Sequence, residues 1–261
     1  MSRLRLVALL TAGALTACAA KAAPVATAGF TPQQRAQIVQ ILRDAMKKDP
    51  TILRDAIVVL QADNDRLEAQ ARHDAITNRE NELFDSSDPS VGNPRGNVTL
   101  VEFFDPRCPY CRELAPTLER FVSKDGKVRL VYKVFPILGP ASELGSRALL
   151  AAQRQGRYDA LREALMAGSS TDFTQTSIRE TAERVGLDWP RLERDMNSAG
   201  VDRKLAANKE LASALGIDGT PTIVIGEKLV EGADIPTIAA AVANTRHDRS
   251  RDQSKLSVGM R

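Results

Sequence analysis

The chain has 261 residues, of which 43 % are hydrophobic and 26 % are charged, and its formal net charge is +3. This length allows one sizeable hydrophobic core with an accessory segment. The composition is ordinary for a soluble globular protein, and so small a net charge gives no indication of nucleic-acid binding. No stretch after the N-terminal region approaches the roughly 20 apolar residues that a transmembrane helix needs.

Residues 1–28 have the pattern of an export signal. Two arginines precede an apolar stretch, residues 6–17, which is too short to span a bilayer as a mature helix. The motif "LTAC" also has the form of a lipobox that ends at Cys18. In that case Cys18 takes a lipid and becomes the mature N-terminus, whereas cleavage beside other small residues is the alternative.

A helix is predicted directly after this signal. Thr31 is a good N-cap, Pro32 suits the first helical position, and Gln34 completes a capping box. Apolar residues then recur at helical spacing until "KKDP" interrupts them at residues 47–50.

A second helix is predicted from about residue 51 to the late seventies. Leu53, Leu60 and Leu67 lie seven residues apart and form a short heptad seam, with Asn64 interleaved. Two amphipathic helices without a sheet in their own segment need a partner surface. We therefore expect residues 29–92 to be an oligomerisation stalk and a linker, and packing against the rest of the chain is the alternative.

The segment "DSSDPSVGNPRGN" is rich in turn residues and predicts a boundary, so a second domain is expected over 93–245. The pattern there is a strand in "VTLVEFF", an amphipathic helix, a strand in "VRLVYKVFPI", a helical insertion at about 140–216, a hairpin in "GTPTIVIGEKLVEG" and a last helix. The polar residues 246–261 are expected to be a disordered tail.

Cys108 and Cys111 are the only thiols that remain once Cys18 is lipidated or removed. The loop between them is too small for a useful structural staple. A zinc site needs four ligands, usually with a second Cys or His pair. The chain has two histidines, His73 and His247, and both lie outside the predicted catalytic domain, so no metal site is predicted. Two thiolates that hold Cu(I) stay an open alternative.

The spacing Cys-x-x-Cys at the start of a helix suits thiol-disulfide exchange. If Cys108 caps the helix that begins at Pro109, unpaired N–H groups and the helix dipole stabilise its thiolate. Arg107 and Arg112 can add positive potential. Cys108 is then the nucleophile and Cys111 the resolving thiol. No cofactor is expected beyond a redox-active Cys108–Cys111 disulfide.

The motifs "VEFFDPRCPYC" and "GTPTIVIG", in this order, resemble the DsbA-like branch of the thioredoxin superfamily over roughly residues 93–245. The segment that begins "FTPQQRAQIVQ" resembles the stalk of ScsC-like proteins. The resemblance implies an α/β thioredoxin fold with a helical insertion, preceded by an α-helical stalk. It also implies the periplasm of a Gram-negative bacterium, with membrane contact only through a lipid at Cys18.

The resemblance also implies roles for single residues. Glu102 is expected beneath the active site, where it moves the proton of the inner cysteine. Independently of the resemblance, Lys133 is a candidate partner for Glu102 because it lies on the next predicted strand. Pro221 is expected to be cis, and the loop with Thr220 is expected to bind the substrate backbone. Tyr110 between the cysteines and Thr220 before the proline resemble isomerases more than oxidases.

The predicted function is that of a protein disulfide isomerase or reductase that acts on misoxidised proteins. A DsbA-type disulfide oxidase and a copper-binding protein are the alternatives. The expected partners are proteins with thiols or disulfides, a membrane redox partner and further copies of the same chain, with a trimer favoured by the resemblance. No nucleic-acid partner is expected.

Overall fold

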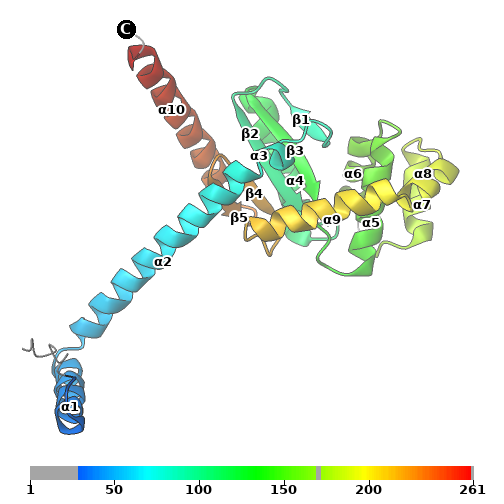
Figure 1. Ribbon diagram of the computed structural model, residues 1–261. Coiled ribbons are helices and arrows are strands. Elements are labelled where there is room, and N and C mark those ends of the chain that lie inside the picture. Colours follow the sequence, from blue (N-terminus) through cyan, green and yellow to red (C-terminus); the bar gives the residue numbers. More distant parts are fainter. Residues whose placement is uncertain (1–28, 169–171, 260–261) are drawn as a thin grey trace, which may run out of the picture. The chain divides into compact units, whose positions relative to one another are not determined.

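The computed structural model describes residues 29–168 and 172–259 (Figure 1). The predicted export signal and Cys18 lie outside the described residues. The chain divides into two compact units, one that ends at Ala62 and one that starts at Asp63. Over the described part of the chain, no helix has both the length and the apolar composition of a membrane-spanning segment.

The first unit contains α1 (Pro32–Lys48) and the beginning of α2 (Thr51–Asn78). The predicted capping box is confirmed, because the N–H of Gln34 donates to Oγ1 of Thr31 at 3.2 Å and the N–H of Thr31 donates to Oε1 of Gln34 at 2.8 Å. No residue of α1 is buried. Large apolar side chains are exposed along both helices, namely Ile38, Val39, Ile41, Leu42, Ile52, Leu53, Ile57, Val58, Val59 and Leu60.

The second unit contains a five-stranded sheet in the order β1-β3-β2-β4-β5. The strands are β1 (Ser90–Gly92), β2 (Val98–Phe104), β3 (Val128–Val134), β4 (Thr222–Ile225) and β5 (Lys228–Glu231). The central strands β2 and β3 are parallel, and every other pair is antiparallel. A parallel pair needs a crossover, which α4 (Pro109–Asp125) supplies.

The second unit also contains several further helices. They are α3 (Glu80–Leu83), α5 (Pro140–Gln153), α6 (Tyr158–Ala167), α7 (Gln175–Arg184), α8 (Trp189–Met196), α9 (Ala199–Ala214) and α10 (Ile235–Gly259). Figure 1 shows α5, α6, α7 and α8 grouped together, with α9 leading back toward β5. The predicted helical insertion between β3 and β4 is therefore confirmed.

The two faces of the sheet belong to two apolar clusters. Even-numbered residues of β2 and β3, such as Leu100 and Leu130, lie in a cluster with residues of α4 and α10. Odd-numbered residues, such as Val101 and Val131, lie in a cluster with residues of α9. This alternation follows from the period of two in a strand. Because Cys108 and Cys111 at the start of α4 belong to the first cluster, only even-numbered residues of β2 and β3 share their face of the sheet.

The linker expected before residue 93 differs from the structure. β1 lies inside the predicted linker and pairs antiparallel with the edge of β3. Leu83 and Asp88 are buried in the second unit. The turn-rich composition predicted a boundary here, but it gave no signal for a three-residue edge strand that is stabilised by pairing with β3.

The disordered tail expected from residue 246 also differs from the structure, because α10 continues to Gly259. Arg246 donates to both carboxylate oxygens of Asp125 and, through Nε, to Oδ1 of Asn97 at 2.8 Å. The start of the helix is anchored by buried Ile238 and Val242. A polar sequence can continue a helix into solvent when its first turns are packed.

Candidate active site

Cys108 is the N-cap residue of α4, with extended backbone angles of φ −62° and ψ 121°, and Pro109 occupies the first turn. This arrangement confirms the predicted helix start. Only 5 % of Cys108 is exposed. Its thiol donates to the carbonyl oxygen of Thr220, with the sulfur and oxygen 3.2 Å apart. The cysteine therefore lies between a helix N-terminus, which favours an anion, and the loop that precedes β4.

The loop at Thr220 has the geometry that the sequence predicted, because the peptide bond between Thr220 and Pro221 is cis. Pro221 is buried, whereas Thr220 is partly exposed. Oγ1 of Thr220 is itself buried and has no hydrogen-bond partner among the described residues. The carbonyl of Thr220 is thus directed at Cys108, and the loop stands beside the reactive thiol.

Asp105 holds the segment before Cys108 in place. Its carboxylate is fully buried and accepts hydrogen bonds from the backbone N–H groups of Arg107 at 2.8 Å, Ile137 at 2.9 Å and Leu138 at 3.0 Å. Its carbonyl accepts from the N–H of Cys108 at 3.0 Å. Sequence reasoning missed this residue, although an aspartate after a buried strand and before a proline is a turn signal.

Cys111 lies one helical turn after Cys108 and is fully buried. Both cysteines are free thiols. Burial raises the pKa of Cys111 far above that of an ordinary thiol, and the nearby carboxylate of Glu102 raises the pKa further. The two thiols therefore differ strongly in environment, and Cys111 needs a base before it can react as a thiolate.

Glu102 is buried in the middle of β2, between Tyr132 of β3 and Ile223 of β4. Burial raises the pKa of its carboxyl group to about 7, and Arg162 partly opposes this shift. Oε1 has no hydrogen-bond partner among the described residues. A carboxyl group that titrates near neutral pH next to Cys111 can accept its proton.

Lys133 does not pair with Glu102, so that expectation is wrong. The register aligns Lys133 with Phe103, and the lysine is on the opposite face of the sheet from Glu102. There it forms a buried ion pair with Asp88 and donates to the carbonyl oxygen of Glu82 at 2.5 Å. The reason is that successive side chains along a strand point to opposite faces of the sheet. In the observed register, the even-numbered residues of β2 and β3 share one face and the odd-numbered residues share the other.

Arg162 of α6 is the cation near Glu102, and sequence reasoning missed it. The guanidinium group pairs with Glu119 of α4 and lies 4.3 Å from the ring centroid of Tyr132. The Tyr132 hydroxyl donates to the same Glu119 oxygen at 2.9 Å. An arginine in an amphipathic helix is usually exposed. The burial of Arg162 near Glu102 is therefore visible only in the tertiary structure.

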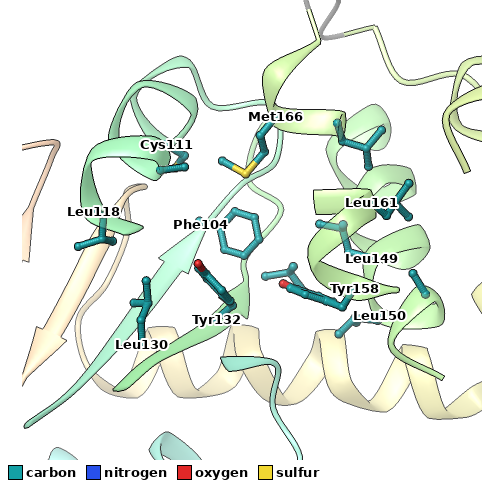
Figure 2. Close-up of a cluster of buried hydrophobic side chains, with 14 of the residues drawn as sticks. Phe104, Cys111, Leu118, Leu130, Tyr132, Leu149, Leu150, Tyr158, Leu161 and Met166 are labelled. Carbon is teal, nitrogen blue, oxygen red and sulfur yellow. The ribbon is translucent and has the colours of Figure 1, made fainter. Parts of the chain in front are cut away.

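Aromatic and sulfur side chains fill the space around this polar group. Figure 2 shows Phe104, Tyr132, Tyr158 and Met166 in the same buried cluster as Cys111. The rings of Tyr132 and Tyr158 are stacked, with centroids 6.1 Å apart. The surroundings are thus of low polarity, which strengthens electrostatic effects on the buried carboxyl group and thiol.

The other predicted residues lie at the rim of the site. Tyr110 is 63 % exposed. Arg107 donates to the carbonyl oxygen of Leu138 at 2.9 Å, and Arg112 donates to that of Leu165 at 3.1 Å. Arg107 therefore bonds to a backbone carbonyl of the segment after β3 and Arg112 to one in the last turn of α6, and both residues lie close to Cys108 in the chain.

Neither histidine lies at this site. His73 pairs with Glu227 at 2.9 Å, and His247 is exposed. Within residues 29–168 and 172–259, no three His, Cys, Asp or Glu side chains are grouped in a way that could hold a metal ion.

Comparisons with known proteins agree with this geometry. Residues 99–243 match the family model of the DSBA-like thioredoxin domain. A thioredoxin-like oxidoreductase from Silicibacter pomeroyi DSS-3 is 42 % identical, with a TM-score of 0.62, and the match covers 64 % of this chain and 97 % of that one. The Proteus mirabilis ScsC structure in a transitional conformation is 27 % identical, with a TM-score of 0.59 and coverage of 84 % and 97 %.

Curated relatives include the probable disulfide bond formation protein D of Bacillus cereus, which is 27 % identical over 57 % of this chain and 75 % of that protein. The chain also matches two Na⁺/H⁺ antiporters of the genus Salinispora, of whose length it spans only 25 % and 28 %. The predicted thioredoxin-like fold, with its mixed sheet and many helices, is confirmed. Because the family model covers more than half of its residues, the chain belongs to the DSBA-like thioredoxin domain family.

Proposed function

We propose that the protein is an exported thiol-disulfide oxidoreductase that reduces and isomerises wrongly formed disulfides in other proteins. One observation carries this proposal. The Cys108 thiol lies at the N-terminus of α4, 3.2 Å from the carbonyl oxygen before a cis-proline, while Cys111 is buried one turn further on. Such a pair can exchange disulfides and then release a trapped intermediate.

The reaction divides between the two thiols. The Cys108 thiolate attacks a substrate disulfide, which forms a mixed disulfide and releases one substrate sulfur as a thiolate. Glu102 accepts the proton of Cys111, and the Cys111 thiolate attacks the sulfur of Cys108. A Cys108–Cys111 disulfide forms, the second substrate thiolate leaves, and two electrons have passed to the substrate.

The surface around Cys108 supports a protein as the substrate. Beyond residue 67 of the described chain, the large apolar side chains that are exposed are Tyr110, Ile137 and Leu138. Ile137 and Leu138 follow β3 and are held next to the Cys108 segment by Asp105. An exposed apolar surface beside a reactive thiol suits the apolar residues that misfolded chains expose.

Isomerisation is favoured over one-pass oxidation by Tyr110 between the cysteines, by Thr220 before Pro221 and by the apolar stalk. A DsbA-type oxidase is the second candidate, because a relative is named for disulfide bond formation. We place the protein in the periplasm, with a lipid anchor at Cys18 and a membrane protein that keeps the pair reduced. The stalk then assembles the chain into a trimer.

Reactivation of scrambled ribonuclease tests this proposal against oxidation of reduced ribonuclease. An isomerase reactivates the scrambled enzyme faster than it oxidises the reduced one, and its redox potential is about −180 mV or lower. A potential near −120 mV with rapid oxidation would establish the oxidase instead. Copper titration of the reduced protein separates both from a copper-binding protein that has no turnover.

Covalent trapping tests the separate roles of the thiols. Cys111→Ser retains the nucleophile but loses the resolving thiol, so it should accumulate mixed disulfides with substrate proteins. Cys108→Ser should form none and should lose exchange activity. Non-reducing gels of both variants after incubation with scrambled ribonuclease give the result, and mixed disulfides on Cys108→Ser alone would reverse the assignment.

A further inference from the structure

The helical insertion supplies a buried arginine to the thiol site. Arg162 is only 2 % exposed, and its Nε has no hydrogen-bond partner among the described residues. One terminal nitrogen pairs with Glu119 of α4, and the other lies 3.6 Å from the sulfur of Met166. A buried guanidinium group in contact with a single partly exposed carboxylate is an expensive arrangement unless a second anion shares its charge.

Glu102 is that second anion. Tyr132, over whose ring the guanidinium lies, is aligned with Glu102 on the adjacent strand, so both groups are on the same face of the sheet. The titratable groups that face Glu102 come from several elements. They are Cys111 of α4, Tyr132 of β3, and Tyr158 and Arg162 of α6. Glu119 and Glu163 are the further acidic groups that interact with Arg162. β4 contributes Ile223, which does not titrate.

We propose that Arg162 is a positioning residue for thiol-disulfide exchange, because its charge is shared between Glu119 and Glu102 and so determines how readily Glu102 takes the proton of Cys111. This inference rests on the proposed function, in which Cys111 is the resolving thiol. It links the helical insertion to the chemistry of the thioredoxin-like core, since the cation comes from α6 and the carboxyl group from β2.

A cavity at the surface connects this group with solvent. It lies between α4 and α6, has a volume of about 570 Å³, and is lined by Arg162, Glu119 and Met166 among others. Glu119 is 30 % exposed, whereas Arg162 is buried. The pair of side chains therefore extends from the partly exposed Glu119 at the wall of this cavity to the buried guanidinium group of Arg162.

Direct titration of Glu102 tests the inference. Carbon NMR of the glutamate carboxyl groups in the reduced full-length protein follows the titration, and the spectrum of Glu102→Gln assigns the signal. Arg162→Met removes the cation, so the midpoint should rise by at least about one pH unit. Glu119→Gln removes one of the anions that share the charge of the arginine and leaves Glu102 and Glu163, so the midpoint should fall. Arg162→Lys keeps the charge and should give an intermediate midpoint.

Arg120→Met is the matched control, because Arg120 is exposed on α4 and lines the same cavity. It removes an equal charge and should leave the midpoint unchanged. The rate at which Cys111 resolves a mixed disulfide depends on pH, and the midpoint of that dependence should move in each variant in the same direction as the titration midpoint of Glu102. A midpoint that is unchanged in Arg162→Met and Glu119→Gln overturns the inference, whereas a wild-type protein without exchange activity overturns the proposed function and leaves the NMR result intact.

Discussion

At the scale of single residues, the site depends on two buried thiols at different positions in the first turn of one helix. Cys108 lies at the positive end of a helix dipole and beside a backbone carbonyl, while Cys111 lies one turn further on and has no exposed surface. Burial and the Glu102 carboxylate both raise the pKa of Cys111. The burial that disfavours the Cys111 thiolate therefore follows from its position one turn into the helix, and in our proposal Glu102 makes Cys111 reactive only by accepting its proton.

Glu102→Gln should change the pH dependence of stability. The folded-state pKa of Glu102 is about 7, compared with an ordinary value of 4.5, so the folded protein binds more protons than the unfolded chain between these values. Stability therefore falls as the pH rises from 4.5 to 7, by up to about 3 kcal/mol. Glutamine has no such loss. Urea unfolding of the reduced variant should thus match the wild type at low pH and exceed it at pH 8.

The control for this prediction is Glu113→Gln, which replaces an exposed glutamate in α4. Its carboxyl group is hydrated in both the folded and the unfolded protein. The stability difference from the wild type should therefore be the same at low and high pH. If Glu102→Gln behaves like this control, Glu102 does not carry the buried charge that we assign to it.

At the scale of elements, the in-register pairing of β2 and β3 places two separate charged groups on two faces of one sheet. Glu102 and Tyr132 face α4, while Lys133 faces α9. Lys133 pairs there with Asp88, which lies just before Pro89 and β1, and Lys204 of α9 pairs with the same aspartate. The face toward α9 therefore has an ion cluster that anchors β1 and α9. The face toward α4 has Glu102 and the buried thiol of Cys111.

Asp88→Asn should strongly destabilise the protein. The side chains of Lys133 and Asp88 are each 1 % exposed, so the substitution leaves a buried ammonium group without its anion. Loss of one partner from such a pair costs about 3–5 kcal/mol. The matched control, Glu183→Gln, breaks the exposed pair with Arg179 and should cost less than about 1 kcal/mol. Equal small losses in urea unfolding of both variants would mean that the buried pair is not stabilising.

The sequence predicted most of the elements, because hydrophobic periodicity and turn residues are local signals. The helix start at Thr31, the redox helix at Cys108 and the cis-proline at Pro221 are all confirmed. The helix that begins at Ile235 was also predicted, but its end was not, since a polar helix and a disordered tail have similar composition.

The rest of the site required information that single-sequence patterns do not contain. The partner of Glu102 depends on strand register, and register decided that Lys133 faces away. Arg162 approaches from a helix about 60 residues further along the chain, by tertiary packing alone. β1 has only three residues, too few for a recognisable alternation.

At the scale of the whole molecule, the two units have very different surfaces. The second unit buries two apolar clusters around its sheet. In the first unit, Ile41, Val59 and Leu60 are each more than 60 % exposed, and Leu53 of the predicted seam is 47 % exposed. Exposed apolar residues in this density are typical of surfaces that associate with a partner. This supports our proposal that the stalk assembles several copies of the chain.

Removal of residues 31–62 should separate assembly from exchange chemistry. This deletion ends at the boundary between the units and keeps Ile76 and Leu83, which are buried in the second unit. Light scattering should show a trimer for the full chain and a monomer for the deletion variant. The monomer should still reduce insulin, because Cys108 and Cys111 are intact. Reactivation of scrambled ribonuclease should fall by at least about tenfold, since linked sites no longer engage one substrate repeatedly.

A point substitution makes the same test without changing chain length. Leu60→Asp places a charge in the predicted seam and should dissociate the oligomer, because a buried unpaired carboxylate opposes helix association. Gln61→Asp introduces the same charge one residue away, at a position that is exposed and outside the seam, so it should leave the oligomer intact. If both variants keep the mass of the full chain, or if the wild type is already a monomer, the stalk does not assemble the protein through this seam. Loss of isomerisation in Leu60→Asp together with retained insulin reduction would show that repeated engagement by neighbouring sites, rather than a different thiol chemistry, makes the protein an isomerase.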